Sequence, residues 1–315
     1  MSPLKKEPRR VVITGSNGLL GQKVTELLSQ SQSYTLHLIS SQEESVFGAD
    51  TAPYTRVDIS DRKQVTRFIE GFQPDTIINT AAVTNVDACE TNREVAWKVN
   101  VHGVENLVHA GKLSGSHIVQ LSTDYVFDGK GGPYAEDDRP NPLSYYGRTK
   151  LAAENLLRTS DISHTIVRTM VLYGQARKVK PNFALWLITE LKEGRTVKVV
   201  SDQIGNPTLA DDLAFGITKI VELKKSGVYH IAGPDIMSRL AFAKETARIF
   251  QLDGSLIHPQ LTAALKQPAP RPLKSGLIIL KAQVDLNLPM SGVESGLLIL
   301  RNQLSTLRHP VEIPQ

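Results

Sequence analysis

A strand, a glycine-rich turn and a helix follow one another near the start of this chain, and this order limits the possible folds more than any other feature. The apolar run Arg10 to Thr14 leads into Gly15-Ser-Asn-Gly18-Leu-Leu-Gly21, and a helical pattern continues to Leu28. Glycines in such a turn allow a tight bend, a close approach to a pyrophosphate and close packing of helix on strand. Free N–H groups at the helix start favour an anion. Glycine turns also join strands to helices without any ligand, so this pattern needs support from other residues.

Strands and helices alternate at regular intervals after the turn. The sequence predicts strands at 34–39, 54–57, 75–79, 116–121 and 165–168, and helices at 61–72, at 94–110 and around Tyr146. This alternation predicts an α/β fold with a doubly wound parallel (Rossmann) sheet, whose ligand lies at the carboxyl ends of the strands.

The pattern changes after residue 170. Helices are predicted at 181–193, 211–223, 238–250 and 292–304, and short strands at 196–200 and 228–231. We expect these elements to form a smaller C-terminal lobe that binds the substrate. The predicted domains are residues 1–170, mainly for NAD(P) binding, and residues 171–315, mainly for the substrate, with the chain free to cross between the two lobes.

Other residues near predicted strand ends fit a dinucleotide. Ser40 follows the second strand, where an acidic residue often binds the ribose hydroxyls of NAD. A serine there favours NADP(H) over NAD(H), although no arginine stands beside it to hold a phosphate. Asp58-Ile59 and Ala81-Ala82 follow the next two strands, and small side chains let a flat cofactor lie close to the sheet, although they also suit helix packing. Asn100 is expected to hydrogen-bond backbone near this site.

A hydroxyl residue and a Tyr-x-x-x-Lys pair provide candidate catalytic groups. Thr123 follows an apolar run, and the next predicted helix carries Tyr146 and Lys150. Four residues apart, the two side chains lie on one helix face, along its apolar stripe. A phenol with a pKa of ~10 becomes an acid–base catalyst at neutral pH when an ammonium stabilises its phenolate. In a chain with eight tyrosines the pair alone is weak, and it counts only together with other motifs.

Composition narrows the class of protein. Its net charge of +4 permits an anionic substrate, but the basic residues are scattered, so we expect no nucleic-acid partner. No apolar run reaches the ~20 residues of a membrane helix, and the basic start lacks an apolar signal core. The single cysteine, Cys89, excludes an internal disulfide and is expected to be a packed thiol. We therefore expect a cytoplasmic protein with a short polar N-terminal arm, no metal site and no membrane association.

Several short motifs occur in a fixed order along the chain. They are Thr14-Gly15-x-x-Gly18-x-x-Gly21, Asp58-Ile59, Ala81-Ala82, Thr84-Asn-Val86-Asp87, Ser122-Thr123-Asp124-Tyr125-Val126-Phe127, Tyr146-x-x-x-Lys150, Asn182-Phe183, Asp202-Gln-x-Gly-x-Pro-Thr208 and Arg271-Pro-x-x-Ser-Gly-Leu277. Together they resemble the extended short-chain dehydrogenase/reductases and, within them, the dTDP-4-dehydrorhamnose reductase family. The resemblance spans nearly the whole chain.

This resemblance implies hydride transfer from NAD(P)H to the C4 ketone of a nucleotide-linked 4-keto-6-deoxy sugar. Tyr146 would donate the proton, Lys150 would hold the nicotinamide ribose and lower the Tyr146 pKa, and Thr123 would assist at the carbonyl oxygen. The implied cofactor contacts are Gly15, Asn17, Gly18, Leu19, Leu20, Gly21, Ser40, Asp58, Ile59, Ala81, Ala82, Val83, Asn100, Tyr146 and Lys150. The implied substrate contacts are Thr84, Asp87, Thr123, Asp124, Asn182, Phe183, Gln203, Pro207, Thr208 and Arg271. A homodimer is a further possibility.

One position departs from the family pattern. The family reads Arg-Thr-Ser-Trp-Val-Tyr after the sixth strand, with the tryptophan against the sugar, whereas this chain reads Arg168-Thr-Met170-Val171-Leu-Tyr173. The aromatic platform is missing. The reductase chemistry is unaffected, but the identity of the sugar and of its nucleotide stays open.

Single residues of this sequence argue for or against the other functions that related proteins have. The regulatory β subunit of animal methionine adenosyltransferase binds NADP and also lacks the tryptophan, but retention of Thr123, Tyr146 and Lys150 favours an enzyme. A 4,6-dehydratase needs a second acid where Tyr125 stands. An epimerising reductase needs an extra acid–base pair near the sugar, and Cys89 lies in another segment. A 4-epimerase uses the same threonine, tyrosine and lysine and stays open.

Overall fold

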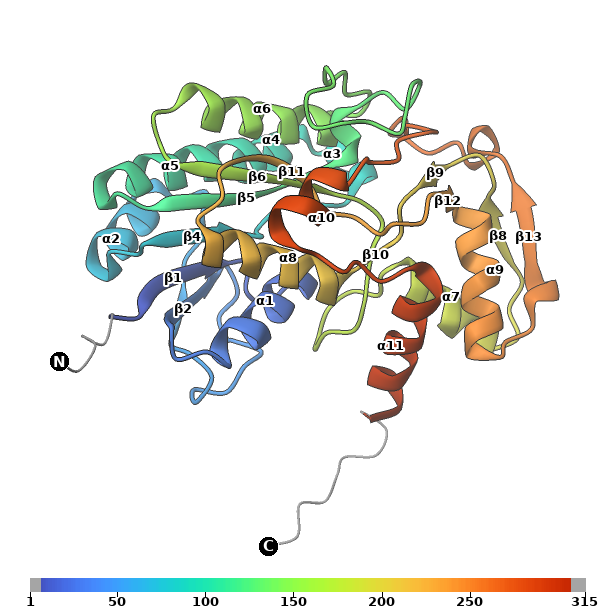
Figure 1. Cartoon of the computed structure of the whole chain (residues 1–315). Coiled ribbons are helices and arrows are strands. Elements are labelled where there is room, and N and C mark those ends of the chain that lie inside the picture. Colours follow the sequence, from blue (N-terminus) through green and yellow to red (C-terminus); the bar gives the residue numbers. More distant parts are fainter. Residues whose placement is uncertain (1–6, 307–315) are drawn as a thin grey trace, which may run out of the picture.

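A parallel sheet of seven strands forms the centre of the molecule (Figure 1). The computed structural model describes residues 7–306, so residues 1–6 of the expected polar arm lie outside the described part. From edge to edge the strands are β11 (Gly227–His230), β6 (His164–Thr169), β5 (His117–Thr123), β4 (Thr76–Asn79), β1 (Arg9–Thr14), β2 (Tyr34–Ser40) and β3 (Tyr54–Arg56). All neighbouring pairs are parallel, which confirms the predicted doubly wound α/β fold.

Helices cover both faces of this sheet because each helix presents an apolar stripe to it. On one face, Leu20 and Val24 of α1 (Leu19–Ser29) share a core with Leu213 and Ile217 of α8 (Ala210–Leu223). The other face is covered by α2 (Arg62–Phe72), α5 (Gly103–Ser114) and α6 (Tyr145–Thr159). The short α10 (Leu280–Leu286) packs beside α8.

Polar side chains determine where two of these helices begin. The Asp61 carboxylate accepts hydrogen bonds from the N–H groups of Lys63 and Gln64 and so caps α2. Ser144 accepts from the N–H of Gly147 at 3.1 Å and caps α6. The second cap fixes the start of the helix that carries Tyr146.

The predicted helix at 94–110 is confirmed as a continuous helical run over residues 93–114, but the π-helical turn within it was not predicted. The structure has α3 (Val86–Thr91), α4 (Arg93–Trp97), a π-helical turn (Lys98–His102) and then α5. Such turns often occur at functional sites. Here Asn100 lies within the turn, and its buried amide bonds the peptide of Val83 outside the helix, a long-range contact that helical periodicity does not reveal.

A smaller lobe stands at one end of the sheet (Figure 1). It contains α7 (Phe183–Lys192), α9 (Arg239–Phe250) and α11 (Val293–Thr306), with β8 (Val197–Val200) pairing in parallel with β13 (Ile257–Gln260). Two further strand pairs link this lobe to the sheet: β7 (Leu172–Tyr173) with β10 (Thr208–Leu209), and β9 (Ile204–Gly205) with β12 (Met237–Ser238).

The assignment of the predicted helix 211–223 and strand 228–231 to the smaller lobe is wrong. α8 packs on α1, and β11 extends the central sheet beside β6. The chain therefore returns to the sheet after residue 209. The physical reason is that the apolar stripe of α8 packs against that of α1 in one core, a match that no local pattern in the sequence reveals.

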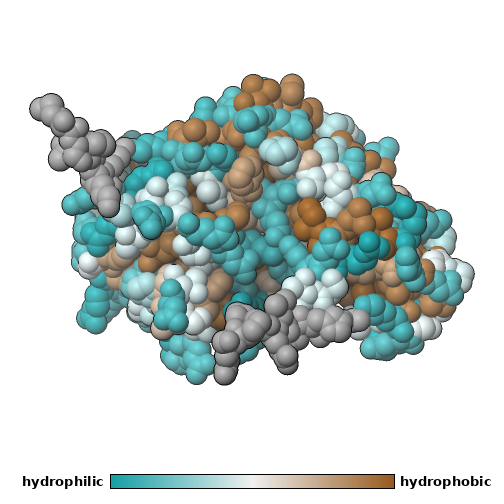
Figure 2. Space-filling view, turned by 60° about the horizontal axis from the view of Figure 1, so that its bottom comes forward, coloured by the Kyte–Doolittle hydropathy of each residue, from teal (hydrophilic) through white to brown (hydrophobic). Residues whose placement is uncertain are grey.

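Figure 2 brings the lower side of Figure 1 forward and shows hydrophilic residues along the middle of this face, between the two lobes. Within residues 7–306, no helix is both long and apolar enough to cross a bilayer.

Candidate active site

A crevice opens where the central strands end. It encloses a cavity of about 330 Å³ lined by the glycine turn, by residues 40–42 and 57–59, and by residues 80–83. Nine of the predicted cofactor residues lie in this lining: Gly15, Asn17, Gly18, Ser40, Asp58, Ile59, Ala81, Ala82 and Val83.

The glycine turn has the form that a pyrophosphate requires. Gly15 adopts a φ of +62°, and a Cβ there would lie 2.7 Å from the backbone nitrogen of Ala81. Gly18 precedes the first turn of α1 and gives it no side-chain cap, so the N–H groups of Leu19 and Leu20 are available to an anion. Gly21 has a packing role instead, because a Cβ there would lie 2.5 Å from the Gly15 carbonyl oxygen. The turn therefore fits a dinucleotide.

Asn17 organises the wall of the crevice that follows β2. Its Nδ2 donates to Gln42 Oε1 and to the Glu44 carbonyl, both at 2.7 Å, and its Oδ1 accepts from the N–H of Val46. Ser40 Oγ lies 2.8 Å from the Tyr54 hydroxyl. The loop after β2 is thus held against the glycine turn by one buried amide.

Asn100 organises the opposite wall. Its Oδ1 accepts from the N–H of Val83 at 2.8 Å, while its Nδ2 donates to the Val83 carbonyl and to Thr149 Oγ1. The side chain is only 2% exposed. Asn100 therefore positions the backbone that lines the crevice.

Tyr146 packs against one residue of this crevice and one residue of a second group of cavities. It packs in one cluster with Val83, which lines the crevice, and with Tyr125, whose ring lies edge-on at 5.7 Å and lines the other cavities. Buried Cys89 belongs to the same cluster, which confirms the predicted packed thiol. Burial and the Asp124 carboxylate raise the pKa of Tyr146, more than the side chain of Thr123 lowers it. The phenol is therefore protonated at neutral pH, in contrast to the expectation that Lys150 brings its pKa down.

Lys150 lies one helical turn beyond Tyr146 and is 4% exposed. Burial lowers its pKa from 10.5 to about 8, although the Glu154 carboxylate raises it. Within residues 7–306, its ammonium forms no ion pair. A buried lysine without a counterion is costly, which indicates that it serves a ligand.

A buried ionic network beneath Lys150 was missed by sequence reasoning. Glu154 Oε2 accepts from Arg168 at 2.8 Å, and Glu154 Oε1 accepts from Ser122 Oγ at 2.5 Å. Glu154 and Arg168 have no exposed surface, and these bonds lower the pKa of Glu154 although burial alone would raise it. The sequence offered one indication of this network, because Glu154 is a charged residue four positions after Lys150, on the same inward-facing side of the helix.

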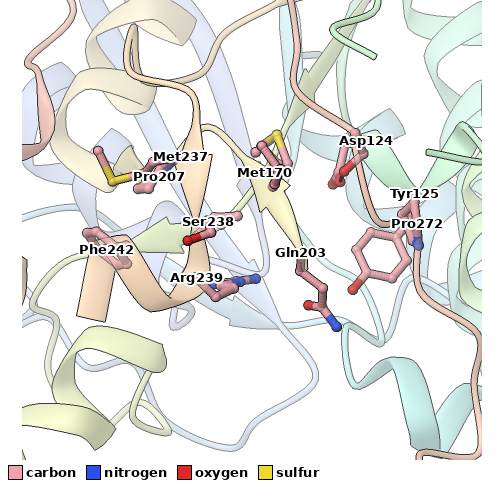
Figure 3. A pocket seen from close by; sticks show the side chains of 14 residues that line it. Asp124, Tyr125, Met170, Gln203, Pro207, Met237, Ser238, Arg239, Phe242 and Pro272 are labelled. Atoms are coloured by element: carbon pink, nitrogen blue, oxygen red, sulfur yellow. Dashed lines mark hydrogen bonds between the residues drawn. The ribbon is translucent and has the colours of Figure 1, made fainter. Parts of the chain in front are cut away.

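Two cavities border Tyr125 on the side of the smaller lobe. One, of about 320 Å³, brings together Phe183, Gln203 and Arg271 with Trp186, Lys198 and Arg239. The other is much smaller and is shown in Figure 3, where Tyr125, Gln203 and Arg239 approach the same space from different elements. Asp124, Gln203 and Pro207, all predicted substrate residues, line this smaller cavity. Sequence reasoning missed Arg239, because the first residue of a helix carries no local signal of its tertiary surroundings.

Asp124 is only 3% exposed and is already hydrogen-bonded. Its two oxygens accept from Ser275 Oγ at 2.6 Å and from Thr123 Oγ1 at 3.0 Å. Burial raises its pKa to about 6, although Ser275, Thr123 and the Arg239 charge oppose this rise. Asp124 therefore orients the Thr123 hydroxyl in the structure described.

Four other predicted substrate residues have different neighbours. The Asp87 carboxylate pairs with both terminal nitrogens of Arg271, at 2.6 and 2.7 Å. Asn182 caps α7 and donates to the Gly174 carbonyl. Thr208 is fully buried and donates to the Asn206 carbonyl, while Thr84 is exposed and lines neither cavity. Their substrate roles stay predictions.

The segment where the family has a tryptophan is strained. Val171 has a φ of +47°, which is unusual for a β-branched side chain, and it lines the smaller cavity. Met170 beside it is 5% exposed, and its sulfur accepts from the N–H of Asn206. An aliphatic and a thioether side chain therefore occupy the place of the missing aromatic ring.

Comparisons with known proteins agree with this geometry. A family model described as RmlD substrate binding domain matches residues 9–302. A dTDP-4-dehydrorhamnose reductase from Streptomyces griseus is 35% identical over 286 residues, which covers 88% of this chain and 87% of that protein. A crystal structure of dTDP-4-dehydrorhamnose reductase from Bacillus anthracis in complex with NADP is 30% identical, has a TM-score of 0.81 and covers 94% of this chain and 99% of that one.

A regulatory protein is also similar. Methionine adenosyltransferase 2 subunit beta from Mus musculus is 29% identical over 257 residues, which covers 80% of this chain and 75% of that protein. Its identity and coverage are below those of the Streptomyces griseus reductase.

Proposed function

The chain belongs to the RmlD substrate binding domain family, and on that premise we propose that it is an NAD(P)H-dependent reductase of a nucleotide-linked 4-keto-6-deoxy sugar, of the dTDP-4-dehydrorhamnose reductase type. The observation that carries this proposal is the packing of Tyr146, a protonated phenol, against Val83 of the dinucleotide crevice and against Tyr125 of the cavities at the smaller lobe. A ketone held there meets a proton donor on one side and the crevice on the other.

The crevice residues suit the nicotinamide cofactor. The glycine turn and the start of α1 would hold its pyrophosphate, residues 40–42 and 57–59 its adenosine half, and Ala81 to Val83 its nicotinamide half. When bound, the cofactor supplies the hydride.

The protein's own residues supply the proton. In reduction, the developing alkoxide is far more basic than a phenolate, so a phenol with a raised pKa still donates readily. Thr123, oriented by Asp124, is close enough to Tyr146 to act on its pKa and would hold the same oxygen. The Lys150 ammonium would stabilise the phenolate after transfer and hold a ribose hydroxyl.

The larger cavity suits the nucleotide. Phe183 and Trp186 supply aromatic surfaces, and Lys198 and Arg239 supply positive charge for a diphosphate. The strained Val171 and buried Met170 would border the sugar. The predicted dTDP moiety and the rhamnose-type sugar both rest on the family comparison.

NADPH is the proposed preferred cofactor. The lining after β2 consists of Ser40, Ser41 and Gln42, which are neutral hydrogen-bonding groups, and a carboxylate there would repel a 2′-phosphate. Affinity for NADH and NADPH, measured side by side, tests this preference. A strong preference for NADH would refute it.

A cytoplasmic location and a homodimer complete the proposal. Both are expectations from the sequence. The oligomeric state can be measured by light scattering of the purified chain.

The experiment that tests the function is a panel of nucleotide-linked 4-keto sugars mixed with NADPH and followed at the nicotinamide absorbance. We expect oxidation of NADPH with a 4-keto-6-deoxy sugar and none with the matched sugar that carries a C4 hydroxyl. Tyr146→Phe is the control for specific chemistry. Tight NADPH binding without oxidation by any sugar would instead support a regulatory subunit, and redox-neutral inversion at C4 would support an epimerase.

A further inference from the structure

A short loop connects β7 to α7 and runs beside the glycine turn. It comprises residues 174–182, Gly-Gln-Ala-Arg-Lys-Val-Lys-Pro-Asn, and is the yellow-green segment between α1 and α7 in Figure 1. Asn182 Nδ2 donates to the Gly174 carbonyl at 2.7 Å, so the two ends of the loop are joined. The loop is therefore compact, in the manner of an Ω-loop.

Gln22 of α1 fixes the middle of this loop. Its Oε1 accepts from the N–H of Arg177 at 2.8 Å, and its Nε2 donates to the Arg177 carbonyl at 2.8 Å. The same Nε2 donates to the Asn17 carbonyl at 2.8 Å, within the glycine turn. Gln22 is fully buried. A single side-chain amide thus joins the peptide of Arg177 to the turn that borders the crevice.

The loop is strongly basic. Arg177, Lys178 and Lys180 carry positive charge, and residues 174–182 contain no acidic residue. All three side chains are exposed, and in the described part of the chain none of them forms an ion pair. Lys23, the cation next to Gln22, is already paired with Asp211 at 2.9 Å. Of the loop cations, Arg177 is the one whose backbone N–H and carbonyl both bond Gln22, which in turn bonds the glycine turn.

We propose that Arg177 binds the pyrophosphate of the nicotinamide cofactor and that Gln22 is the positioning residue that holds it there. An arginine side chain is long enough to reach from the shared Gln22 amide to the start of α1, where a pyrophosphate would meet the free N–H groups. The side-chain amides of Asn17 and Gln22 also link three segments. These are the loop after β2, the glycine turn, and the loop of residues 174–182 that leads to the smaller lobe. The inference rests on the proposed function, because it assigns residues to the same cofactor.

The test measures cofactor affinity without any sugar, by titration of NADH and NADPH on the full chain. Arg177→Gln should weaken both by about tenfold, because it removes a charge-assisted hydrogen bond to a group that both share. The matched control is Lys180→Gln, which makes the same charge change in the same loop and should change affinity less than about twofold. A loss confined to NADPH would place Arg177 at the 2′-phosphate, and equal losses in both variants would indicate nonspecific attraction. Either result overturns the proposal.

Gln22→Met tests the positioning role, because it keeps the size of the side chain and removes its hydrogen bonds. We expect Gln22→Met to weaken cofactor affinity severalfold when it is the only change. Added to Arg177→Gln, it should cause almost no further loss, and general destabilisation does not produce such coupling. Additive losses would contradict the role of Gln22. The Arg177→Gln result stands alone if Gln22→Met folds poorly. If the unaltered chain binds neither dinucleotide, the proposed function fails; if it binds and Arg177→Gln binds equally well, only this inference fails.

Discussion

Tyr146 and Lys150 lie one turn apart on α6, yet burial acts on their pKa values in opposite directions. It raises the pKa of the phenol and lowers that of the ammonium, because in each case it disfavours the charged form. The phenol, which is the proposed proton donor, therefore keeps its proton at neutral pH, and the lysine is held in its charged form at a cost. Both effects favour donation of a proton to a substrate oxygen.

Replacing Tyr146 with phenylalanine tests the donor. We expect kcat for ketone reduction to fall by ~10²-fold or more, because the variant loses proton transfer and little else. NADPH affinity, measured by titration, should be nearly unchanged. Unchanged turnover in a correctly folded variant would remove Tyr146 from the mechanism.

Burial of Lys150 predicts a pH-dependent stability. Its pKa is 10.5 in the unfolded chain and about 8 in the folded one, so between these values the unfolded chain binds more protons. The free energy of unfolding should therefore rise with pH in this window, by up to about 1.4 kcal/mol per unit. Lys150→Met should be more stable than the wild type at neutral pH and should lack this contribution. Urea unfolding of both proteins from ~pH 7 to ~pH 10 isolates it, because other groups cancel in the difference. If the free energy of unfolding depends on pH in the same way in both proteins, the contribution does not come from Lys150.

At the scale of elements, the ionic network of Glu154 joins α6 to two central strands. Ser122 comes from β5 and Arg168 from β6, and both bond the same buried carboxylate of α6. Arg158 adds a partly exposed contact at 2.8 Å. The network therefore holds the helix of Tyr146 and Lys150 against the strand that ends at Thr123. None of its residues lines either cavity at the smaller lobe, so the network positions α6 and does not contact a ligand there.

Glu154→Gln tests this network. Removing the negative charge leaves Arg168 buried without its counterion, which costs about 3–5 kcal/mol of unfolding free energy. Denaturant unfolding measures this cost. The control is Glu190→Gln, which breaks the exposed pair with Arg195 and should have a much smaller effect. Equal effects of the two substitutions would contradict a special role for the buried pair.

At the scale of the whole molecule, the chain leaves the sheet after β6, returns through α8 and β11, and leaves again. The bidentate pair of Asp87 and Arg271 joins α3, beside the crevice, to the segment between β13 and α10. A hydrogen bond from Ala269 to the same carboxylate adds to this link. The two lobes are thus connected near the mouth of the larger cavity, which Arg271 lines.

Asp87→Asn tests this connection. Hydrogen bonds from Arg271 lower the pKa of Asp87, so the pair stabilises the folded chain above the ordinary pKa and loses this contribution as pH falls. We expect the variant to lose about 1 kcal/mol of unfolding free energy in the absence of any ligand, a modest value because the pair is partly exposed. A variant with unchanged stability but weaker sugar binding would instead assign Asp87 to the substrate.

Local patterns in the sequence were sufficient for much of this protein. The glycine turn, the alternation of strands and helices, and the spacing of Tyr146 and Lys150 depend on interactions within a few residues, so they predicted the doubly wound sheet and most elements of the crevice. The tertiary structure alone decided which lobe receives α8 and β11, that Asp87 pairs with Arg271, that Arg239 lines two cavities, and that the backbone of Arg177 bonds Gln22. These features join residues far apart in the chain, and their energies depend on burial and on partners that no local pattern encodes.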